Sequence, residues 1–270
     1  MVLKEKGWSD ENTRRAQLDK PVIEKQAACF GFEAIAEDEK SGKVLTHFNS
    51  VAEKYDIMNT ILSFGTHYIW KHIAIKMLGL KPGQKVLDVC GGTGDMSVMA
   101  AKVVGPAGRV TLFDINREMM TTGRAKSTNA HFRQKVAYVQ GNAEKIALAD
   151  NSFDAAMVSF GIRNVTHMQA GFMEMHRVLK PGGRFLCLEF SKPVTPWFCR
   201  LYDFYSFQIM PIIGQLLAGS RKAYTYLPES IRMFPLPPEL ADILTEIGFR
   251  DVEYRYLTNG IAVAHVGTKK

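Results

Sequence analysis

Long apolar runs are missing from this 270-residue chain, and none approaches the ~20 residues that a membrane-spanning helix requires. The chain also has no internal repeat and no low-complexity tract. Residues 1–20 are rich in charge and contain no apolar segment of the kind found in a secretory signal. These absences predict a soluble, cytoplasmic protein.

Metal-binding and disulfide patterns are also missing. The four cysteines include no CxxC pair, and the seven histidines show no HxH or HExxH spacing. We therefore expect buried free thiols in a reducing compartment, and we expect no metal site.

Acidic residues are outnumbered by basic ones, which gives a net charge of +7 and an isoelectric point near 9.2. Such a balance is typical either of a protein that approaches phospholipid or RNA, or of a mildly basic solvated surface. The basic residues are spread along the chain, which favours the second interpretation. No basic and aromatic RNA-binding module is present, so we expect no nucleic acid partner. Peripheral contact with the inner face of the cytoplasmic membrane stays open.

Short apolar segments alternate with helix-length segments from about residue 70 onward. The expected strands are 85–90, 109–115, 136–141, 153–160 and 183–190, and the expected helices between them are 95–104, 117–128 and 168–180, the last ending at a Lys-Pro-Gly break. This alternation predicts an α/β fold with a mostly parallel, doubly wound sheet. After a helix at 238–247, the last strands, 251–257 and 261–268, lack an intervening helix and are expected to form an antiparallel hairpin at one edge.

The sequence predicts an N-terminal extension and one domain, and two segments of that domain differ from the rest. We expect residues 1–29 to be a poorly ordered N-terminal extension and residues 30–270 to be a single domain. Within that domain, residues 30–69 are predicted to form a helical lid. Residues 193–238 interrupt the α/β alternation with an aromatic, proline-punctuated insertion on the substrate side.

The loop after the first expected strand reads VLDVCGGTGDMS. Gly92 and Gly94 would let the backbone approach a ligand closely. A nicotinamide dinucleotide fingerprint needs a further glycine where this chain has Ser97. Asp88 and Asp95 would repel a pyrophosphate but suit the ammonium and sulfonium of S-adenosylmethionine, with Asp88 near its amino acid end. Alternatively, Asp95 is simply an acidic charge at a helix N-terminus.

Polar residues also follow the second and third expected strands. Asp114 lies 20 residues past Gly94, where an acid accepts hydrogen bonds from ribose hydroxyls. Asn142 and Ala143 follow the third strand, where a side chain and backbone amides could bind an adenine edge. Together these positions predict the Rossmann-like fold of class I methyltransferases, with S-adenosylmethionine as cofactor and S-adenosylhomocysteine as product.

The fourth strand ends in SFGIRN, at the loop that faces the transferred methyl group in this architecture. The Asn/Asp-Pro-Pro-aromatic loop of many amine-methylating enzymes is absent. Arg163 and Asn164 instead suggest an acceptor whose oxygens gain negative charge. The alternative is that Arg163 caps the following helix or pairs with a surface acid.

Several stretches together resemble the C-methyltransferases of menaquinone and ubiquinone biosynthesis, from about Phe30 to the C-terminus. They are YDIMNTILSFGTHYIW (55–70), GGTGD (91–95), SFGIRN (159–164), RVLKPGGRFLCLEFSKP (177–193) and YLPESIRMFP (226–235). The glycine loop and RVLKPGG occur in many methyltransferases, whereas the first, third and last stretches are specific. The resemblance implies cofactor contacts at Thr93, Asp114, Asn142, Ala143 and Ser159.

The resemblance also has departures. The family often has Thr-His before FGF, where this chain has Ala28 and Cys29. The segment SRKAYTYL, residues 220–227, is closer to menaquinone-type members. We therefore expect methylation of demethylmenaquinol to menaquinol. The alternatives are a 2-polyprenyl-6-methoxy-benzoquinol, another phenol, sterol or lipid headgroup, or a non-catalytic cofactor-binding subunit of a quinone-synthesis assembly. A homodimer is compatible with the sequence.

The expected chemistry starts from a hydroquinone whose ring carbon becomes nucleophilic when a neighbouring hydroxyl loses its proton. Arg163 and Asn164 are expected to stabilise the phenolate oxygen. The proton acceptor stays open among an ordered water and four side chains, namely Tyr55, Asp56, His67 and Glu189. Asp56 and Asn59 would share one helix face and could close over the cofactor. The insertion from Trp197 to Leu217 is the expected wall of a channel for the isoprenoid tail. Its wall residues are expected to be Trp197, Phe198, Tyr202, Phe204, Tyr205, Phe207, Met210 and Ile212.

Overall fold

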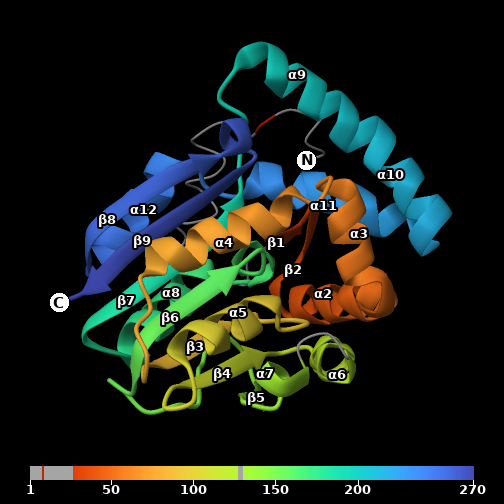
Figure 1. Ribbon diagram of the computed structural model, residues 1–270. Helices are drawn as coiled ribbons and strands as arrows, with labels where there is room; N and C mark the ends of the chain where they lie inside the picture. The colour runs from red at the N-terminus through yellow and green to blue at the C-terminus, as the bar shows by residue number, and fades with distance from the viewer. Residues whose placement is uncertain (1–7, 9–26, 127–129) are drawn as a thin grey trace.

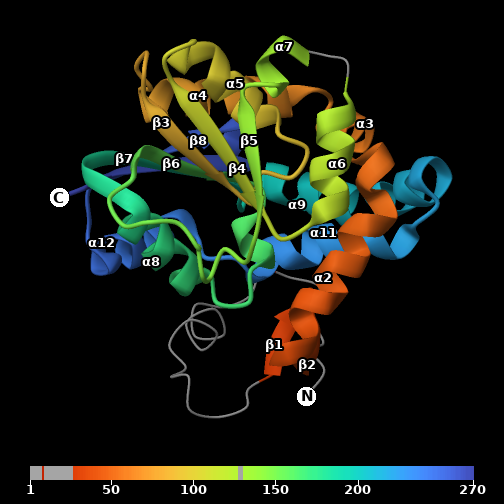
Figure 2. The same cartoon turned by 90° about the horizontal axis from the view of Figure 1, so that it is seen from below.

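The computed structural model describes residue 8, residues 27–126 and residues 130–270. Most of the predicted N-terminal extension and the end of the helix expected at 117–128 lie outside these ranges. Within them, the chain forms one central sheet with helices on both faces (Figures 1 and 2).

The central sheet has seven strands in the order β5-β4-β3-β6-β7-β9-β8. Their bounds are β3 Lys85–Val89, β4 Arg109–Asp114, β5 Val136–Gln140, β6 Phe153–Ser159, β7 Leu179–Phe190, β8 Phe249–Leu257 and β9 Ala262–Lys269. The first five strands in this order are parallel, whereas β9 runs antiparallel to β7 and to β8. The predicted parallel sheet with an antiparallel hairpin at its edge is confirmed.

Strand β7 differs from its expected bounds because it begins before the Lys-Pro-Gly segment rather than after it. Phe153 of β6 pairs with Leu179 of β7. Ala155, only two residues further along β6, pairs with Arg184, which is five residues further along β7. The residues between Leu179 and Arg184 therefore form an irregularity within the strand, with Gly182 at φ 76°. The expected break is a bulge in the ladder, not the start of the strand.

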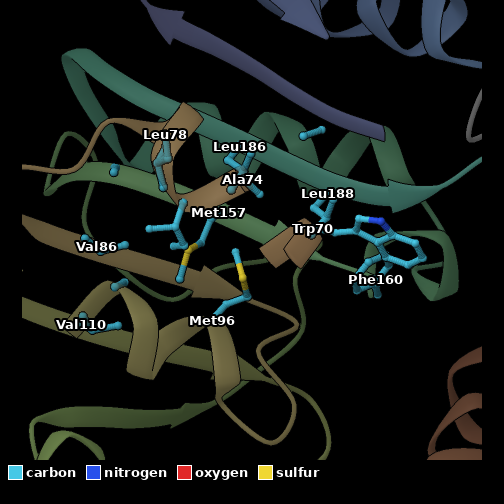
Figure 3. Packing of buried hydrophobic residues seen from close by; sticks show 14 of the residues in the cluster. Trp70, Ala74, Leu78, Val86, Met96, Val110, Met157, Phe160, Leu186 and Leu188 are labelled. Carbon is cyan, nitrogen blue, oxygen red and sulfur yellow. The ribbon is translucent and has the colours of Figure 1, made fainter. Parts of the chain in front are cut away.

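Two apolar clusters sandwich the sheet because successive strand residues point to opposite faces. On one face, Met157 and Leu186 pack against α4 (Thr66–Leu78) and α5 (Asp95–Val104) (Figure 3). On the other face, Val158 and Cys187 pack against α8 (Met168–Val178) and α12 (Pro237–Ile247). Cys187 is the only one of the four cysteines that is fully buried, so the expectation of buried thiols holds for that residue alone.

The predicted helical lid begins as a β-hairpin. Strands β1 (Ala27–Phe30) and β2 (Glu33–Ala36) pair antiparallel, and the lid continues with α2 (Glu37–Val51), a 3₁₀ helix (Ala52–Lys54) and α3 (Tyr55–Leu62). The hairpin is held by tertiary packing, because the Phe30 ring stacks on the Tyr226 ring with centroids 4.1 Å apart. This contact joins the lid to a helix nearly 200 residues away in the chain.

The aromatic insertion is helical. It consists of α9 (Pro196–Phe204), a π-helical turn (Tyr205–Ile209), α10 (Met210–Ile213) and a second π-helical turn (Gly214–Ala218), followed by α11 (Arg221–Met233). Figure 1 shows α9 and α10 as one long arm that projects beside α3. Pro211 lies within this arm and has no N–H to donate, which favours a local change of winding. Among the described helices, none is long and apolar enough to cross a membrane.

Candidate active site

A cavity of ≈ 1290 Å³ lies at the carboxyl ends of the central parallel strands. The cavity lies beside the ends of β3 and β6, which are neighbours in the sheet. The strands that follow β3 in the chain lie on one side of this pair, and the strand that follows β6 lies on the other side. Ligands of such folds usually bind at the point where the strand order reverses in this way. The lid helices α2, α3 and α4 and the helices α9 to α11 supply the rest of its wall. The cavity therefore joins the loops after the strands to two segments that the sequence places far away.

The glycine loop after β3 adopts a backbone that few residues tolerate. Cys90, Gly92 and Gly94 have φ values of 53°, 55° and 80°. A Cβ on Gly91 would lie 2.5 Å from Leu112 Cγ, so a side chain does not fit there. A Cβ on Gly92 would meet only Met119 Cε, at 3.5 Å, within the described residues. The loop thus presents an open stretch of backbone on the cavity side.

Asp114 ties this loop to the end of β4. Its Oδ2 accepts a hydrogen bond from the Gly92 N–H at 2.8 Å, and its Oδ1 accepts one from the Asn116 N–H at 2.7 Å. Burial raises the pKa of Asp114, although these backbone hydrogen bonds oppose the shift. The carboxylate is therefore held in one orientation at the cavity wall.

The third and fourth strand ends also reach the cavity. Asn142 Oδ1 accepts a hydrogen bond from the Glu144 N–H at 2.9 Å, and Asn142 and Ala143 line the wall. Ser159 lines it as well, and its Oγ is buried without a hydrogen-bond partner among the described residues. A buried hydroxyl of this kind favours a ligand that completes its hydrogen bonding. With the open backbone at Gly92, these positions fit S-adenosylmethionine.

The two acids that flank the glycine loop have different surroundings. Asp88 is 1% exposed, accepts a hydrogen bond from Ser97 Oγ at 2.6 Å, and burial raises its pKa to about 7. Asp95 forms ion pairs with Lys71, Lys126 and Arg133 at 3.1, 3.3 and 3.6 Å. Burial would raise the pKa of Asp95, but Lys71 and Lys126 hold it far below its usual range. The two acids were expected to act together on the cofactor's cations, but Asp95 is already compensated by the protein.

The lid is fastened to the glycine loop through Asp56 of α3. Its Oδ1 accepts a hydrogen bond from Thr93 Oγ1 at 2.8 Å, and its carboxylate also pairs with Lys126. Thr93, Tyr55 and Asn59 line the cavity, whereas Asp56 and Gly94 stand behind its wall. Asp56 therefore connects lid and loop rather than facing an acceptor. Burial raises the pKa of Tyr55, so its hydroxyl keeps its proton at neutral pH.

Arg163 forms a buried ion pair with Glu189 at the end of β7. The side chains are 5% and 2% exposed, and Nη1 lies 3.1 Å from Oε2. Nη1 also donates to the Phe160 carbonyl, and Nε donates to Ser230 Oγ at 3.4 Å. The partner is a buried acid, not the surface acid considered as an alternative. Burial raises the pKa of Glu189, while the guanidinium opposes the shift.

Asn164 is held by two hydrogen bonds. Its Nδ2 donates to the Gly161 carbonyl at 3.2 Å, and its Oδ1 accepts from the Tyr226 hydroxyl at 2.8 Å. Both Asn164 and Tyr226 line the cavity. The amide orientation is thus fixed by Tyr226 of α11.

His67 is 3% exposed and lies in the cavity wall near the start of α4. Thr60 Oγ1 donates to the Asp56 carbonyl at 2.9 Å and lies 3.2 Å from His67 Nε2. Because the hydroxyl has one proton, Nε2 carries the imidazole proton and Nδ1 is left as an acceptor. Burial, with a smaller effect of Lys71, lowers the pKa of His67 to about 4. The ring is therefore neutral at pH 7.

Two cavity residues escaped the sequence analysis. His47 of α2 contacts the Tyr226 ring with centroids 4.8 Å apart, and burial followed by the charge of Arg163 lowers its pKa to about 4. Tyr226 lies in one of the quoted stretches, but nothing in that stretch indicates that its hydroxyl reaches Asn164. Only the packing of α2 and α11 against the strand ends brings them together, so no local pattern could have identified them.

The end of the cavity beneath the arm has an apolar wall, and we call this part the apolar chamber. Its wall includes these residues of the arm and α11: Phe198, Leu201, Tyr202, Phe204, Tyr205, Ile209, Met210, Tyr224 and Leu227. Leu62 and Phe64 of the lid complete it. Trp197 and Ile212, which were expected in the channel wall, are 66% and 49% exposed and lie on the solvent side of the arm.

The chain is similar to proteins of known family. A model of the ubiE/COQ5 methyltransferase family matches residues 36–269. The chain is 48% identical over 240 residues to the ubiquinone/menaquinone biosynthesis C-methyltransferase UbiE of Haemophilus ducreyi, covering 89% of this chain and 93% of that protein. It is 44% identical over 256 residues to the protein of the same description from Ectopseudomonas mendocina, covering 95% and 98%.

Solved structures share the fold at lower identity. An S-adenosylmethionine-dependent methyltransferase from Thermotoga maritima matches with a TM-score of 0.57 and 21% identity, covering 83% of this chain and 99% of that one. Another from Aquifex aeolicus matches with a TM-score of 0.55 and 22% identity, covering 74% and 89%. The predicted class I fold is confirmed, and family and fold together imply S-adenosylmethionine as methyl donor. The chain therefore belongs to the ubiE/COQ5 methyltransferase family and is a methyltransferase.

Proposed function

We propose that this enzyme methylates a ring carbon of a polyprenyl quinol and that demethylmenaquinol is its preferred acceptor. The main support is one continuous cavity that joins polar loops at the strand ends to an apolar chamber beneath the arm. The first part suits a nucleoside and the second suits an isoprenoid tail. The names of the relatives, which concern ubiquinone and menaquinone biosynthesis, favour the same class of acceptor.

In this proposal the strand ends hold the cofactor. Asp114 accepts hydrogen bonds from the ribose hydroxyls, and Asn142 and Ala143 contact the adenine. Gly92, Thr93 and Ser159 lie along the rest of the molecule, with Asp88 beneath its amino acid end. When bound, S-adenosylmethionine supplies an electrophilic methyl group.

Arg163 and Asn164 orient the acceptor and stabilise the charge on its oxygen. A quinol attacks through carbon once its hydroxyl is deprotonated, because the phenolate pushes electron density onto the ring. The new bond from ring carbon to methyl replaces the methyl–sulfur bond of the donor, which would leave as S-adenosylhomocysteine. Loss of the proton on that ring carbon to solvent then restores the aromatic quinol. A guanidinium keeps its charge at all relevant pH values, so Arg163 acts electrostatically. Glu189 fixes the guanidinium from behind at 3.1 Å, and Tyr226 fixes the Asn164 amide. The donors are thus oriented before the acceptor binds.

The proton of the quinol hydroxyl needs an acceptor, and the named side chains are all constrained. Tyr55 remains protonated, Asp56 is bound to Thr93 and Lys126, and Glu189 is paired with Arg163. His67, with a pKa of about 4, is a weak base that accepts a hydrogen bond more readily than a proton. We therefore assign the hydroxyl proton to solvent, and the charge of Arg163 favours its loss because it stabilises the phenolate that remains.

The benzoquinol of ubiquinone synthesis is the second candidate acceptor, because the relatives are described as enzymes of both ubiquinone and menaquinone biosynthesis. The preference for the naphthoquinol depends on the segment at 220–227, which contributes Ala223 and Tyr224 to the chamber wall. Direct competition between short-tailed analogues of the two quinols would rank them.

The test is anaerobic methyl transfer from labelled S-adenosylmethionine to a short-tailed demethylmenaquinone, with and without reductant. We expect label on a ring carbon only under reduction, because the oxidised quinone has no phenolate to activate the ring. Transfer to the oxidised form at the same rate would contradict the mechanism. Cofactor binding without transfer to either quinol would contradict the assigned acceptor.

A further inference from the structure

The arm carries a stripe of large apolar side chains that are exposed to solvent. Its members are Trp197, Leu201, Phe204, Ile212 and Leu216, with Leu216 76% exposed. Their spacing places them along the length of the arm, from the first turn of α9 to the second π-helical turn. Contiguous apolar surface of this kind marks an interaction site rather than ordinary solvent exposure.

A second exposed stripe runs along the lid. It comprises Ile57 and Ile61 of α3, Phe64 in the turn after it, and Tyr68 and Ile69 of α4. The lid stripe lies close to the arm, because the Phe64 ring is 5.9 Å from the ring of Tyr205, which follows Phe204 of the first stripe. Figure 1 shows α3 beside the arm. We call the combined surface the arm–lid face.

The cavity opens on the arm–lid face. Phe64, Leu201, Phe204 and Ile209 are exposed and also line the cavity wall. The same side chains thus form both the mouth of the apolar chamber and part of the outer surface. A molecule that leaves the chamber here meets apolar side chains on the outside as well.

The arm side of this face carries an excess of positive charge. From residue 194 to residue 228 the sequence contains a single acid, Asp203, and that acid pairs with the buried Arg232. Arg200, Arg221 and Lys222 are exposed in the same segment. Lys54, also exposed, donates through Nζ to the Leu217 carbonyl at 2.9 Å, so it lies beside the end of the stripe.

We propose that the arm–lid face docks on the surface of an anionic phospholipid bilayer, so that the cavity mouth opens into the acyl region. This inference rests on the proposed function, because a polyprenyl quinol resides in the bilayer and its tail must enter the chamber. Exposed apolar side chains can insert to the depth of the headgroup boundary, while the cations contact lipid phosphates. A protein partner or second copy on this face would instead cover the mouth through which the acceptor enters.

The test is flotation of the full chain with vesicles, without any quinol. One set contains phosphatidylcholine alone, and the other includes one third phosphatidylglycerol. We expect binding to the anionic vesicles that weakens in ~0.5 M salt, because exposed charges are screened at that ionic strength. Trp197→Ser/Leu216→Ser, which leaves the cavity wall unchanged, should lower the partition coefficient at least ~10-fold.

Two further variants make the result specific. Met173→Ser on α8 removes an exposed apolar side chain, 59% exposed, outside the arm–lid face and should bind like the wild type. Arg221→Gln/Lys222→Gln should weaken binding to anionic vesicles by roughly 5-fold or more and leave binding to neutral ones unchanged. Absence of wild-type binding, or equal binding by Trp197→Ser/Leu216→Ser, would overturn the proposal, and dimer formation through this face would do the same.

This experiment separates the docking surface from the acceptor assignment. An enzyme that methylates a short-tailed quinol in solution but never binds vesicles retains its proposed function and loses the docking surface. An enzyme that binds anionic vesicles through the arm–lid face but transfers no methyl group to any quinol retains the docking surface and loses the proposed function.

Discussion

The two halves of the cavity are built in different ways. In the cofactor half, Asp114, Asn142 and Ser159 follow successive strands, and each needs only its own strand end to reach the site. In the acceptor half, Arg163 depends on Glu189 and Asn164 depends on Tyr226, partners 26 and 62 residues away. The first half is a property of the sheet, whereas the second exists only when the lid, β7 and α11 have packed together.

The halves also differ in what they offer a ligand. The glycine loop offers exposed backbone with positive φ at three of five consecutive residues from Cys90 to Gly94. The acceptor half offers side chains whose orientation is fixed by a buried ion pair and a hydrogen-bonded amide. Substitutions in the two halves should therefore separate cofactor affinity from the rate of transfer.

The largest effect is expected from Arg163→Met in the acceptor half. Loss of the guanidinium should lower kcat about 10²- to 10³-fold, as for removal of a preorganised donor, with cofactor affinity unchanged. Turnover under single-turnover conditions and calorimetry with S-adenosylhomocysteine measure the two quantities. The variant leaves Glu189 buried without its partner, so Arg163→Met/Glu189→Gln serves as the matched control for stability. Recovery of activity in that double variant would show that the charge itself is not needed.

Asp114→Asn in the cofactor half should lower the affinity for the cofactor rather than the rate of methyl transfer. The dissociation constant for S-adenosylhomocysteine should rise about 10- to 100-fold, because hydrogen bonds to a charged group contribute about 1.5–3 kcal/mol. The Michaelis constant for the quinol should stay within about twofold of the wild-type value. Asp242→Asn, at an exposed position on α12, is the matched control. A change in the quinol constant alone would show that the two halves are not separable at this residue.

The smallest effect concerns Asp88 and the pH dependence of stability. Its pKa is raised to about 7 in the folded protein, against an ordinary value of 3.8, so the folded state binds the proton more tightly. The free energy of unfolding should therefore fall as pH rises from about 4 to about 7, by about 1 kcal/mol between pH 6 and 7. Denaturant titrations of the wild type and Asp88→Asn measure this slope.

Asp88→Asn keeps an oxygen that can accept from Ser97 Oγ but removes the titration. His47, His67 and His265 have pKa values lowered to about 4 and shift the slope in the opposite sense, so the difference between the two proteins is the relevant quantity. Parallel pH profiles for the wild type and the variant would mean that Asp88 stays ionised. That result would mean that a positive charge stabilises the Asp88 carboxylate more strongly than the contacts in the structure indicate.

The errors of the sequence analysis fall where tertiary contacts override local signals. The Lys-Pro-Gly segment has the composition of a break, yet it is an irregularity inside β7 because Leu179 pairs with Phe153. Residues 27–29, expected in a poorly ordered extension, and residues 30–36, expected in a helical lid, together form a β-hairpin, and the Phe30 ring of that hairpin stacks on Tyr226. Asp95 lines the cavity, as its position in the sequence suggested, but the sequence did not indicate that cations from three different elements would pair with it.

The sequence by itself determined the parallel sheet, the strand-end positions of the cofactor half and the family. Those features depend on the periodicity of apolar residues and on short motifs, and both involve residues that are close together in the chain. Only the tertiary structure decided that Arg163 is anchored by Glu189, that Trp197 faces solvent while Phe198 lines the chamber, and that the chamber opens between arm and lid. Each of these depends on how separate elements pack, and no local pattern specifies which partner a side chain will find.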